Sequence, residues 1–289
     1  MRIRSSLAAL LLPTLLFAQE KVTVKGRIVN GQGEAVEYVQ VGLPGQAIGT
    51  VSTADGRFEI EVPRDTLEFF HVSYLPASYV VTGPSDNVVV VLREQELPAA
   101  VSIGGDTREK YLLRPGKKVL GNGAIISYSL RNGRSEGREL GSVARTKNPF
   151  LVTDILLSVH SNHIPGCVAS INIYRIEGKN ESFVNVLHKP IYFDIAVSDE
   201  PQDFDIRPDE TLLLEPGRYF IAFQTAGCNE QALQDFLANP EEDRKFWEMT
   251  LDFIAYFKSS YLRETALGAM KYFPVNIGIA VKGLEYLSR

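Results

Sequence analysis

The sequence predicts an all-β protein with two folded parts, an N-terminal seven-stranded sandwich at residues 20–94 and a larger β-sandwich at residues 124–289. Short alternating or β-branched runs, separated by turn residues, fill the first part and return after residue 124. Only residues 230–253 place apolar residues at helical spacing. With 45% hydrophobic residues in 289, the chain can bury one large core or two modest ones, and two domains are favoured.

Residues 1–18 predict a secretory signal peptide. Arg2 and Arg4 precede an apolar stretch at 7–17, which is shorter than the roughly 20 apolar residues that span a bilayer. No cysteine follows Ala18, the expected cleavage point, so a lipid anchor is not expected. We therefore expect an exported protein.

The charge of the mature chain argues against nucleic acid as a partner. Loss of Arg2 and Arg4 lowers the formal net charge from −5 by two, to −7, and the sequence has no long basic run. No second apolar run approaches twenty residues. We therefore expect no transmembrane span in the mature chain, and an envelope protein or a glycan as partner.

Seven strands are expected in the first part, with tight turns at Asn30-Gly31 and Asp55-Gly56, residues that tolerate positive φ. The expected strands are Val22–Val29, Tyr38–Val41, Ile48–Ser52, Arg57–Val62, Thr66–Ser73, Ser78–Val81 and Val88–Leu92.

Three features of this part resemble the carboxypeptidase-regulatory-like domain. A first strand at 24–29 enters a glycine turn, a Val-x-Val strand follows, and residues 49–58 read Gly-Thr-x-x-Thr-x-x-Gly-x-Phe. The resemblance implies a transthyretin-like sandwich of the kind appended to zinc carboxypeptidases and to TonB-dependent outer-membrane receptors. It implies a fold and not a reaction.

Residues 95–123 are rich in glycine and proline and predict a linker. The second part then has expected strands at Ile125–Leu130, Phe150–His160, Val168–Ile176, Ile191–Ala196, Thr211–Leu214 and Tyr219–Gln224. Its motifs, among them Gly137-x-Glu139-Leu140-Gly141, resemble a jelly-roll-like domain of unknown function. The helical insertion is expected as two pieces, Glu230–Leu237 and Glu241–Phe253, divided by Asn239-Pro240.

The sequence predicts no catalytic residue, metal or cofactor. Zinc carboxypeptidases need a His-x-x-Glu pair, which is missing, and His160-x-x-His163 needs further ligands. Gly133-Arg134-Ser135-Glu136-Gly137 matches the nucleophile-elbow pattern, but in an all-β context we interpret it as a polar hairpin. Six acidic residues lie within residues 199–210. This segment is either a solvated acidic loop or a calcium site.

Two further sets of residues are candidates for sites. Trp247, Tyr256 and Tyr261, with Phe246 and Phe257, form either an aromatic platform for a sugar ring or part of the core. Cys167 and Cys228 are the only cysteines and are expected to form a disulfide, because both fall at the same end of two strands predicted to be antiparallel neighbours.

These observations favour a non-catalytic binding or assembly protein of the periplasm or outer membrane. An accessory subunit of a TonB-dependent receptor is one form of this hypothesis. The alternative is a carbohydrate-binding protein or glycan-active hydrolase whose site lies in the second part.

Overall fold

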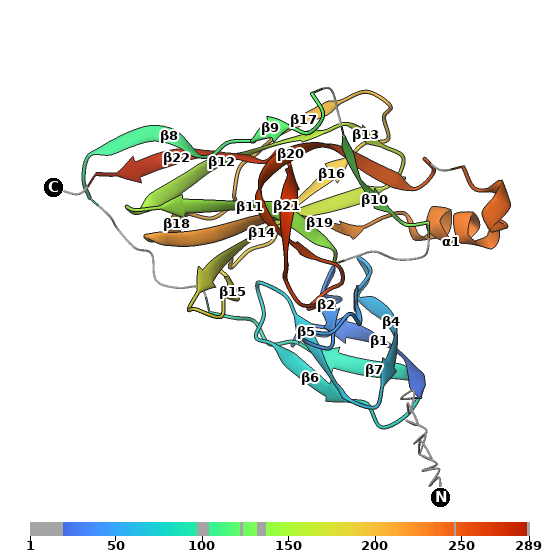
Figure 1. The fold of residues 1–289 in the computed structure, drawn as a ribbon. Coiled ribbons are helices and arrows are strands. Elements are labelled where there is room, and N and C mark those ends of the chain that lie inside the picture. The colour runs from blue at the N-terminus through green and yellow to red at the C-terminus, as the bar shows by residue number, and fades with distance from the viewer. Residues whose placement is uncertain (1–19, 97–103, 122–123, 132–136, 246, 288–289) are drawn as a thin grey trace, which may run out of the picture.

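The computed structural model describes residues 20–96, 104–121, 124–131, 137–245 and 247–287 (Figure 1). These residues form many strands and one short α-helix, which confirms the predicted all-β class. The predicted signal peptide, Ser135 and Phe246 lie outside the described residues.

The N-terminal sandwich has seven strands in two sheets, as the sequence predicts. One sheet orders its strands β4, β1, β7, and the other orders them β3, β2, β5, β6. β1 and β7 run parallel and the remaining pairs run antiparallel. The strands are β1 (Lys21–Val29), β2 (Gln40–Gly42), β3 (Gly49–Val51), β4 (Arg57–Pro63), β5 (Thr66–Phe70), β6 (Ala77–Val80) and β7 (Ser85–Val91).

The turns of this sandwich follow the predicted chemistry, with one shift. Gly56 has a φ of +78°, and a Cβ there would lie 2.5 Å from the Ile28 carbonyl oxygen, so glycine is needed for both reasons. At the first turn the positive φ falls at Gly33 and not at Gly31. The Asn30 side-chain oxygen accepts two of the backbone N–H groups that follow it, which holds that turn closed.

The larger sandwich consists of a ten-stranded and a five-stranded sheet, both antiparallel. The ten-stranded sheet contains β10 (Ile125–Ser129), β20 (Thr250–Arg263), β11 (Glu139–Thr146), β19 (Gly217–Gly227), β14 (Cys167–Glu177), β15 (Ser182–Asn185), β9 (Lys117–Lys118), β13 (Ser161–Asn162), β16 (Ile191–Ile195) and β21 (Lys271–Ile277). The five-stranded sheet contains β17 (Gln202–Ile206), β12 (Phe150–Val159), β22 (Ala280–Tyr286), β8 (Thr107–Leu113) and β18 (Leu212–Leu214).

One apolar core fills the space between these two sheets. Phe150 and Ile155 of β12 contribute from the five-stranded side, and Ile171 and Phe223 contribute from the ten-stranded side. All four side chains are fully buried. This face of the ten-stranded sheet is called the inner face below.

The predicted linker at 95–123 needs correction. Residues Thr107–Leu113 form β8, which pairs with β22, and Lys117–Lys118 form β9, which pairs with β20. The glycines and prolines of this segment therefore interrupt strands of the larger sandwich, while residues 97–103 lie outside the described chain.

The predicted helical insertion is only partly correct. α1 (Glu230–Ala238) begins at Asn229, whose side chain caps the N–H of Ala232, and lies at one end of the larger sandwich (Figure 1). The second predicted helix, 241–253, is instead a 3₁₀ turn, Glu241–Asp243, followed by the start of β20 at Thr250. Its apolar residues satisfy strand alternation, because Leu251 and Phe253 both enter the core. Neither α1 nor any other described helix has the length and apolarity needed to cross a membrane.

The N-terminal sandwich packs against the outer face of the ten-stranded sheet. Gln40 Nε2 donates to Gln224 Oε1 over 3.3 Å, and Ser73 Oγ donates to the His188 carbonyl oxygen over 3.1 Å. A Cβ on Gly49 would collide with the backbone of Ala266, so the loop after β20 sits directly on β3. We call this contact the inter-sandwich interface.

A buried polar network occupies the outer face beneath this interface. Glu139 Oε1 accepts from Asn172 Nδ2 at 2.8 Å and from the Tyr174 hydroxyl at 2.6 Å. The other oxygen of Glu139 forms an ion pair of 3.2 Å with Arg263. Asn172 also donates to Gln224, which connects the network to Gln40 of the first sandwich. We call these residues, Glu139, Asn172, Tyr174, Gln224 and Arg263, the outer-face network.

Candidate functional site

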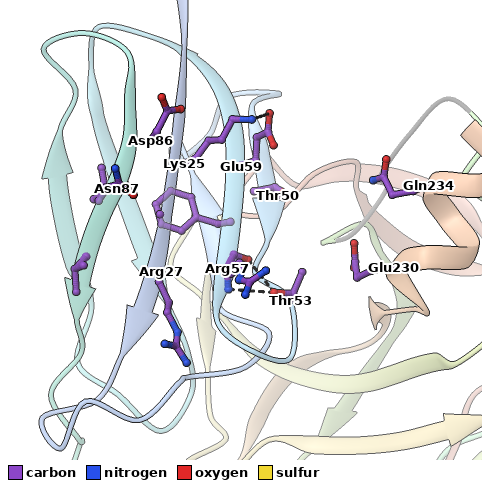
Figure 2. Close-up of a pocket in the computed structure, with 14 residues that line it drawn as sticks. Lys25, Arg27, Thr50, Thr53, Arg57, Glu59, Asp86, Asn87, Glu230 and Gln234 are labelled. Atoms are coloured by element: carbon purple, nitrogen blue, oxygen red, sulfur yellow. Dashed lines mark hydrogen bonds and ion pairs between the residues drawn. The ribbon is translucent and has the colours of Figure 1, made fainter. Parts of the chain in front are cut away.

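A groove lies between the N-terminal sandwich and α1. It encloses about 810 Å³. Figure 2 shows Lys25, Arg27, Arg57 and Glu59 on adjacent strands, with Glu230 of α1 across the groove from them. The groove is therefore bounded by both folded parts.

Exposed ion pairs form much of the groove wall. Lys25 Nζ lies 2.9 Å from Glu59 Oε1, and the pKa of Lys25 is raised by its hydrogen bond and charge interaction with that carboxylate. Arg57 Nε lies 3.0 Å from Asp55 Oδ2. Both pairs are solvated, and such pairs exchange partners at little cost in free energy. The wall therefore offers both signs of charge to an incoming polar segment.

The hydroxyl groups of the groove have a structural role. Thr53 Oγ1 donates to Asp55 Oδ1 at 2.5 Å and accepts the backbone N–H of Arg57 at 3.0 Å, which closes the turn before β4. The hydrogen bond from Thr53 also lowers the pKa of Asp55. This arrangement fixes the turn at the groove wall.

A second, smaller hollow lies on the other side of α1, around Trp247. It encloses about 370 Å³ and is lined by His163, Pro165, Val197, Ala232, Phe236, Trp247, Glu248 and Met249. Trp247 is 56% exposed, whereas Phe236 and Met249 are buried beneath it. The hollow therefore has an apolar floor and an accessible indole ring.

The other predicted members of the aromatic platform lie elsewhere. Tyr261 is buried, and its hydroxyl donates to Glu181 at 2.6 Å. Tyr256 lies on β20 six residues after Thr250, roughly 20 Å along a strand. The structure does not bring Trp247, Tyr256 and Tyr261 together, because an extended strand separates residues that helical spacing would have aligned.

The histidine pair and the acidic segment do not form one metal site among the described residues, where no three His, Cys, Asp or Glu side chains cluster for a metal. His163 instead pairs with Asp199, with Nε2 and Oδ1 2.8 Å apart. The segment 199–210 is not a single loop, since Gln202–Ile206 form β17. Its carboxylates have separate partners, and Glu210 accepts the N–H groups of His188 and Lys189.

The structure places the two cysteines of the expected disulfide close together, and the bond itself stays a prediction. β14 and β19 are antiparallel neighbours, and Val168 pairs with Gly227, so the predicted placement of Cys167 near Cys228 is confirmed. The two side chains are not joined in the structure. Burial, with a contribution from the Asp194 charge, raises the pKa of Cys167 to about 12. Cys167 thus packs in the core as a small apolar side chain and is a poor source of the thiolate that oxidation requires.

Sequence reasoning did not identify the groove residues or the outer-face network. Arg27 and Arg57 occupy the exposed positions of alternating strands, where charge is ordinary. Arg263 is the last residue of β20, whose other residues are mainly apolar. A charged residue in that position was the one sequence feature that could have indicated its buried ion pair with Glu139. The pairing of His163 with Asp199 joins residues 36 apart and has no local signal.

Comparisons with known proteins give few relatives. No family model matches the chain, so the resemblance to the carboxypeptidase-regulatory-like domain has no further support, and no curated protein matches. Among solved structures, the chain is similar to a DUF3823 family protein from Parabacteroides merdae, with 12% identity, a TM-score of 0.21, and coverage of 89% of this chain and 98% of that one. A DUF3823 family protein from Bacteroides ovatus has 11% identity, a TM-score of 0.21, and coverage of 71% and 97%. Infectious bursal disease virus Gt strain has 10% identity, a TM-score of 0.24, and coverage of 96% and 62%.

Proposed function

We propose that this protein is a non-catalytic, exported binding or assembly protein of the bacterial envelope, and that the groove holds an extended segment of an envelope protein. The observation that carries the proposal is the groove itself, which is open, polar and bounded by two folded parts. Its exposed ion pairs can re-form with a partner's charges.

The inter-sandwich interface supports this proposal because it fixes the two walls of the groove. A buried hydrogen bond joins Gln40 to Gln224, and the ring centroids of Tyr38 and Tyr192 lie 5.1 Å apart, edge to face. A preformed groove loses less conformational entropy on binding than a flexible one. A TonB-dependent receptor is the partner class that the first part's resemblance favours.

Photo-crosslinking tests the groove with a matched pair of positions. Val89 lines the groove and is 66% exposed, whereas Val80 is 64% exposed and lies on β6 of the other sheet. We expect a crosslinker at Val89, and not at Val80, to capture one envelope protein in intact cells. The double variant Arg27→Glu with Arg57→Glu should abolish that product, while Arg64→Glu, outside the groove, should not. Equal capture from both valines, or capture that survives the double variant, contradicts the proposal.

Export is tested separately. The mature chain should begin near Gln19 and fractionate with the periplasm or outer membrane, as N-terminal sequencing of fractionated cells would show. An intact Met1 in the cytosolic fraction contradicts the export proposal.

A further inference from the structure

We propose that the hollow around Trp247 binds one ring of a neutral glycan, with the sugar stacked on the indole and its hydroxyl groups bound at the rim. This surface is separate from the groove, so its test can fail without affecting the groove proposal, and the reverse also holds.

Trp247 is held in an exposed position by its own backbone. The Thr250 hydroxyl donates to the Trp247 carbonyl oxygen at 2.8 Å, and the Glu248 N–H donates to the Lys245 carbonyl oxygen at 3.1 Å. Met249 closes the turn with a φ of +53°, a conformation that costs free energy in a residue other than glycine. The turn that carries the indole is therefore fixed before any ligand arrives, which lowers the entropic cost of binding.

Arg244 fixes the connection between α1 and this turn. Its guanidinium donates to the carbonyl oxygens of Leu237 at 2.6 Å and Asn239 at 2.9 Å, and it lies 5.1 Å from the ring centre of Phe236. Phe236 lines the hollow. Arg244 therefore connects the end of α1, which supplies Phe236 to the floor of the hollow, to the segment that leads into the Trp247 turn.

The rim supplies hydrogen-bonding groups beside the apolar surface. His163 Nε2 lies 2.8 Å from Asp199 Oδ1, and 91% of the Asp199 side chain is exposed. His163 and Glu248 line the hollow itself. A carboxylate accepts hydroxyl protons with lone pairs left over after one contact. An indole face, which is electron-rich, attracts the C–H groups on the flat face of a sugar ring. A pyranose carries both features, hydroxyl groups at its edge and C–H groups on its face.

Size and charge select a sugar ring over other occupants. A volume of about 370 Å³ falls at the small end of ligand pockets, which run from roughly 300 Å³. Glu248 in the lining, and Asp199 beside the lining residue His163, place negative charge near the rim, which disfavours anionic polysaccharides and anionic bilayers.

The fluorescence of Trp247 provides a direct test, because it is the only tryptophan in the chain. Purified mature protein is titrated with cellohexaose, xylohexaose, mannohexaose and penta-galacturonic acid. We expect at least one neutral oligosaccharide to shift the emission to shorter wavelength and to lower acrylamide quenching at least twofold. The acidic oligosaccharide should do neither.

Variants then separate stacking from general effects. By calorimetry, Trp247→Ala should weaken binding of the active oligosaccharide at least tenfold, whereas Trp247→Tyr should stay within about threefold because it keeps a ring. Asp199→Asn should weaken binding severalfold. Tyr272→Ala is the matched control, since Tyr272 is 66% exposed on β21 and does not line the hollow.

Several results would overturn the inference. These are no change in Trp247 fluorescence with any neutral oligosaccharide, binding by the acidic one alone, or Trp247→Ala binding as tightly as the parent protein. A fluorescence shift caused only by phosphatidylglycerol vesicles would identify a membrane contact in place of a sugar site.

Discussion

The two faces of the ten-stranded sheet are built from the same strands but hold their neighbours by different means. On β14, Ile171 and Ile173 enter the apolar core, while Asn172 and Tyr174 join the outer-face network. Apolar packing is tolerant of substitution as long as volume is kept. A buried polar network is intolerant of losing one member, since the group left behind is unsatisfied. The inner face should therefore tolerate substitutions that keep volume, whereas the outer face should lose stability when a single partner is removed.

The largest expected effect comes from breaking the ion pair of the outer face. Arg263→Met leaves the Glu139 carboxylate buried without its charge partner and should lower the free energy of unfolding by about 3–5 kcal/mol. The double variant Glu139→Leu with Arg263→Met should recover much of that loss, as urea unfolding would show. Arg207→Met, which breaks the exposed pair with Asp154, is the control and should change little. An equal loss in the single and double variants would mean that the two faces do not differ in this way.

A pH effect of about 3 kcal/mol is expected at the inter-sandwich interface. Burial lowers the pKa of His71 from 6.5 to about 4. In the unfolded chain His71 is protonated below pH 6.5, whereas in the folded chain it is protonated only below about pH 4. The free energy of unfolding therefore falls as the pH is lowered from 6.5 to about 4. Tyr192 and Tyr74 face the ring and do not titrate there.

Urea unfolding at pH 7.5 and pH 4.5 measures this effect. His71→Gln should reduce the difference in stability between the two pH values relative to the parent protein, while His160→Gln, at a half-buried histidine elsewhere, should not. If His71→Gln leaves the pH dependence unaltered, the interface does not depend on a neutral His71.

A smaller effect, below about 1 kcal/mol, is expected for Gln40→Leu. Gln224 keeps its hydrogen bond from Asn172, and the Gln40 side-chain oxygen is buried without a hydrogen-bond partner. Its removal therefore offsets the hydrogen bond that is lost. A cavity of about 20 Å³ beside Gln40 has room for one water molecule. A loss above 2 kcal/mol in urea unfolding would show that Gln40 is as important as the ion pair.

The sequence predicts the first sandwich much better than the second. All seven of its strands were expected within a few residues, because each one alternates locally and ends at a turn residue. β11 was missed because Gly141 and Ser142 give little alternation, and glycine is needed at 141 by the close approach of Ile221. The start of β20 was assigned to a helix because Met249 and Phe253 are four residues apart, a spacing that fits both periods.

The candidate site shows the same limit. Trp247 was identified as a candidate from its residue type, and Tyr256 and Tyr261 were wrongly grouped with it as a platform. Its neighbours His163 and Asp199 come from other segments of the chain, and only tertiary structure brings them within 2.8 Å of each other. Local patterns carry no information on such contacts.

The smallest effect concerns the two cysteines, which lie at the end of the same strand pair. Cys167 is buried with a pKa of about 12, and Cys228 is half-buried. In reduced protein we expect iodoacetamide to label Cys228 first and Cys167 only as fast as the core opens. Mass spectrometry over time checks this, and equal labelling rates would place Cys167 outside the core.

The glycine contact between β3 and the loop after β20 restricts what can be exchanged in this protein. A side chain at Gly49 would strike the Ala266 backbone, and Gly42 lies against the same residue. A small sandwich such as the N-terminal one could in principle be exchanged for another by recombination. The surface of this sandwich is complementary to the loop after β20. A related sandwich grafted in its place would need glycine at positions 42 and 49, or it would sit at another angle. At another angle it would no longer face α1 across the groove.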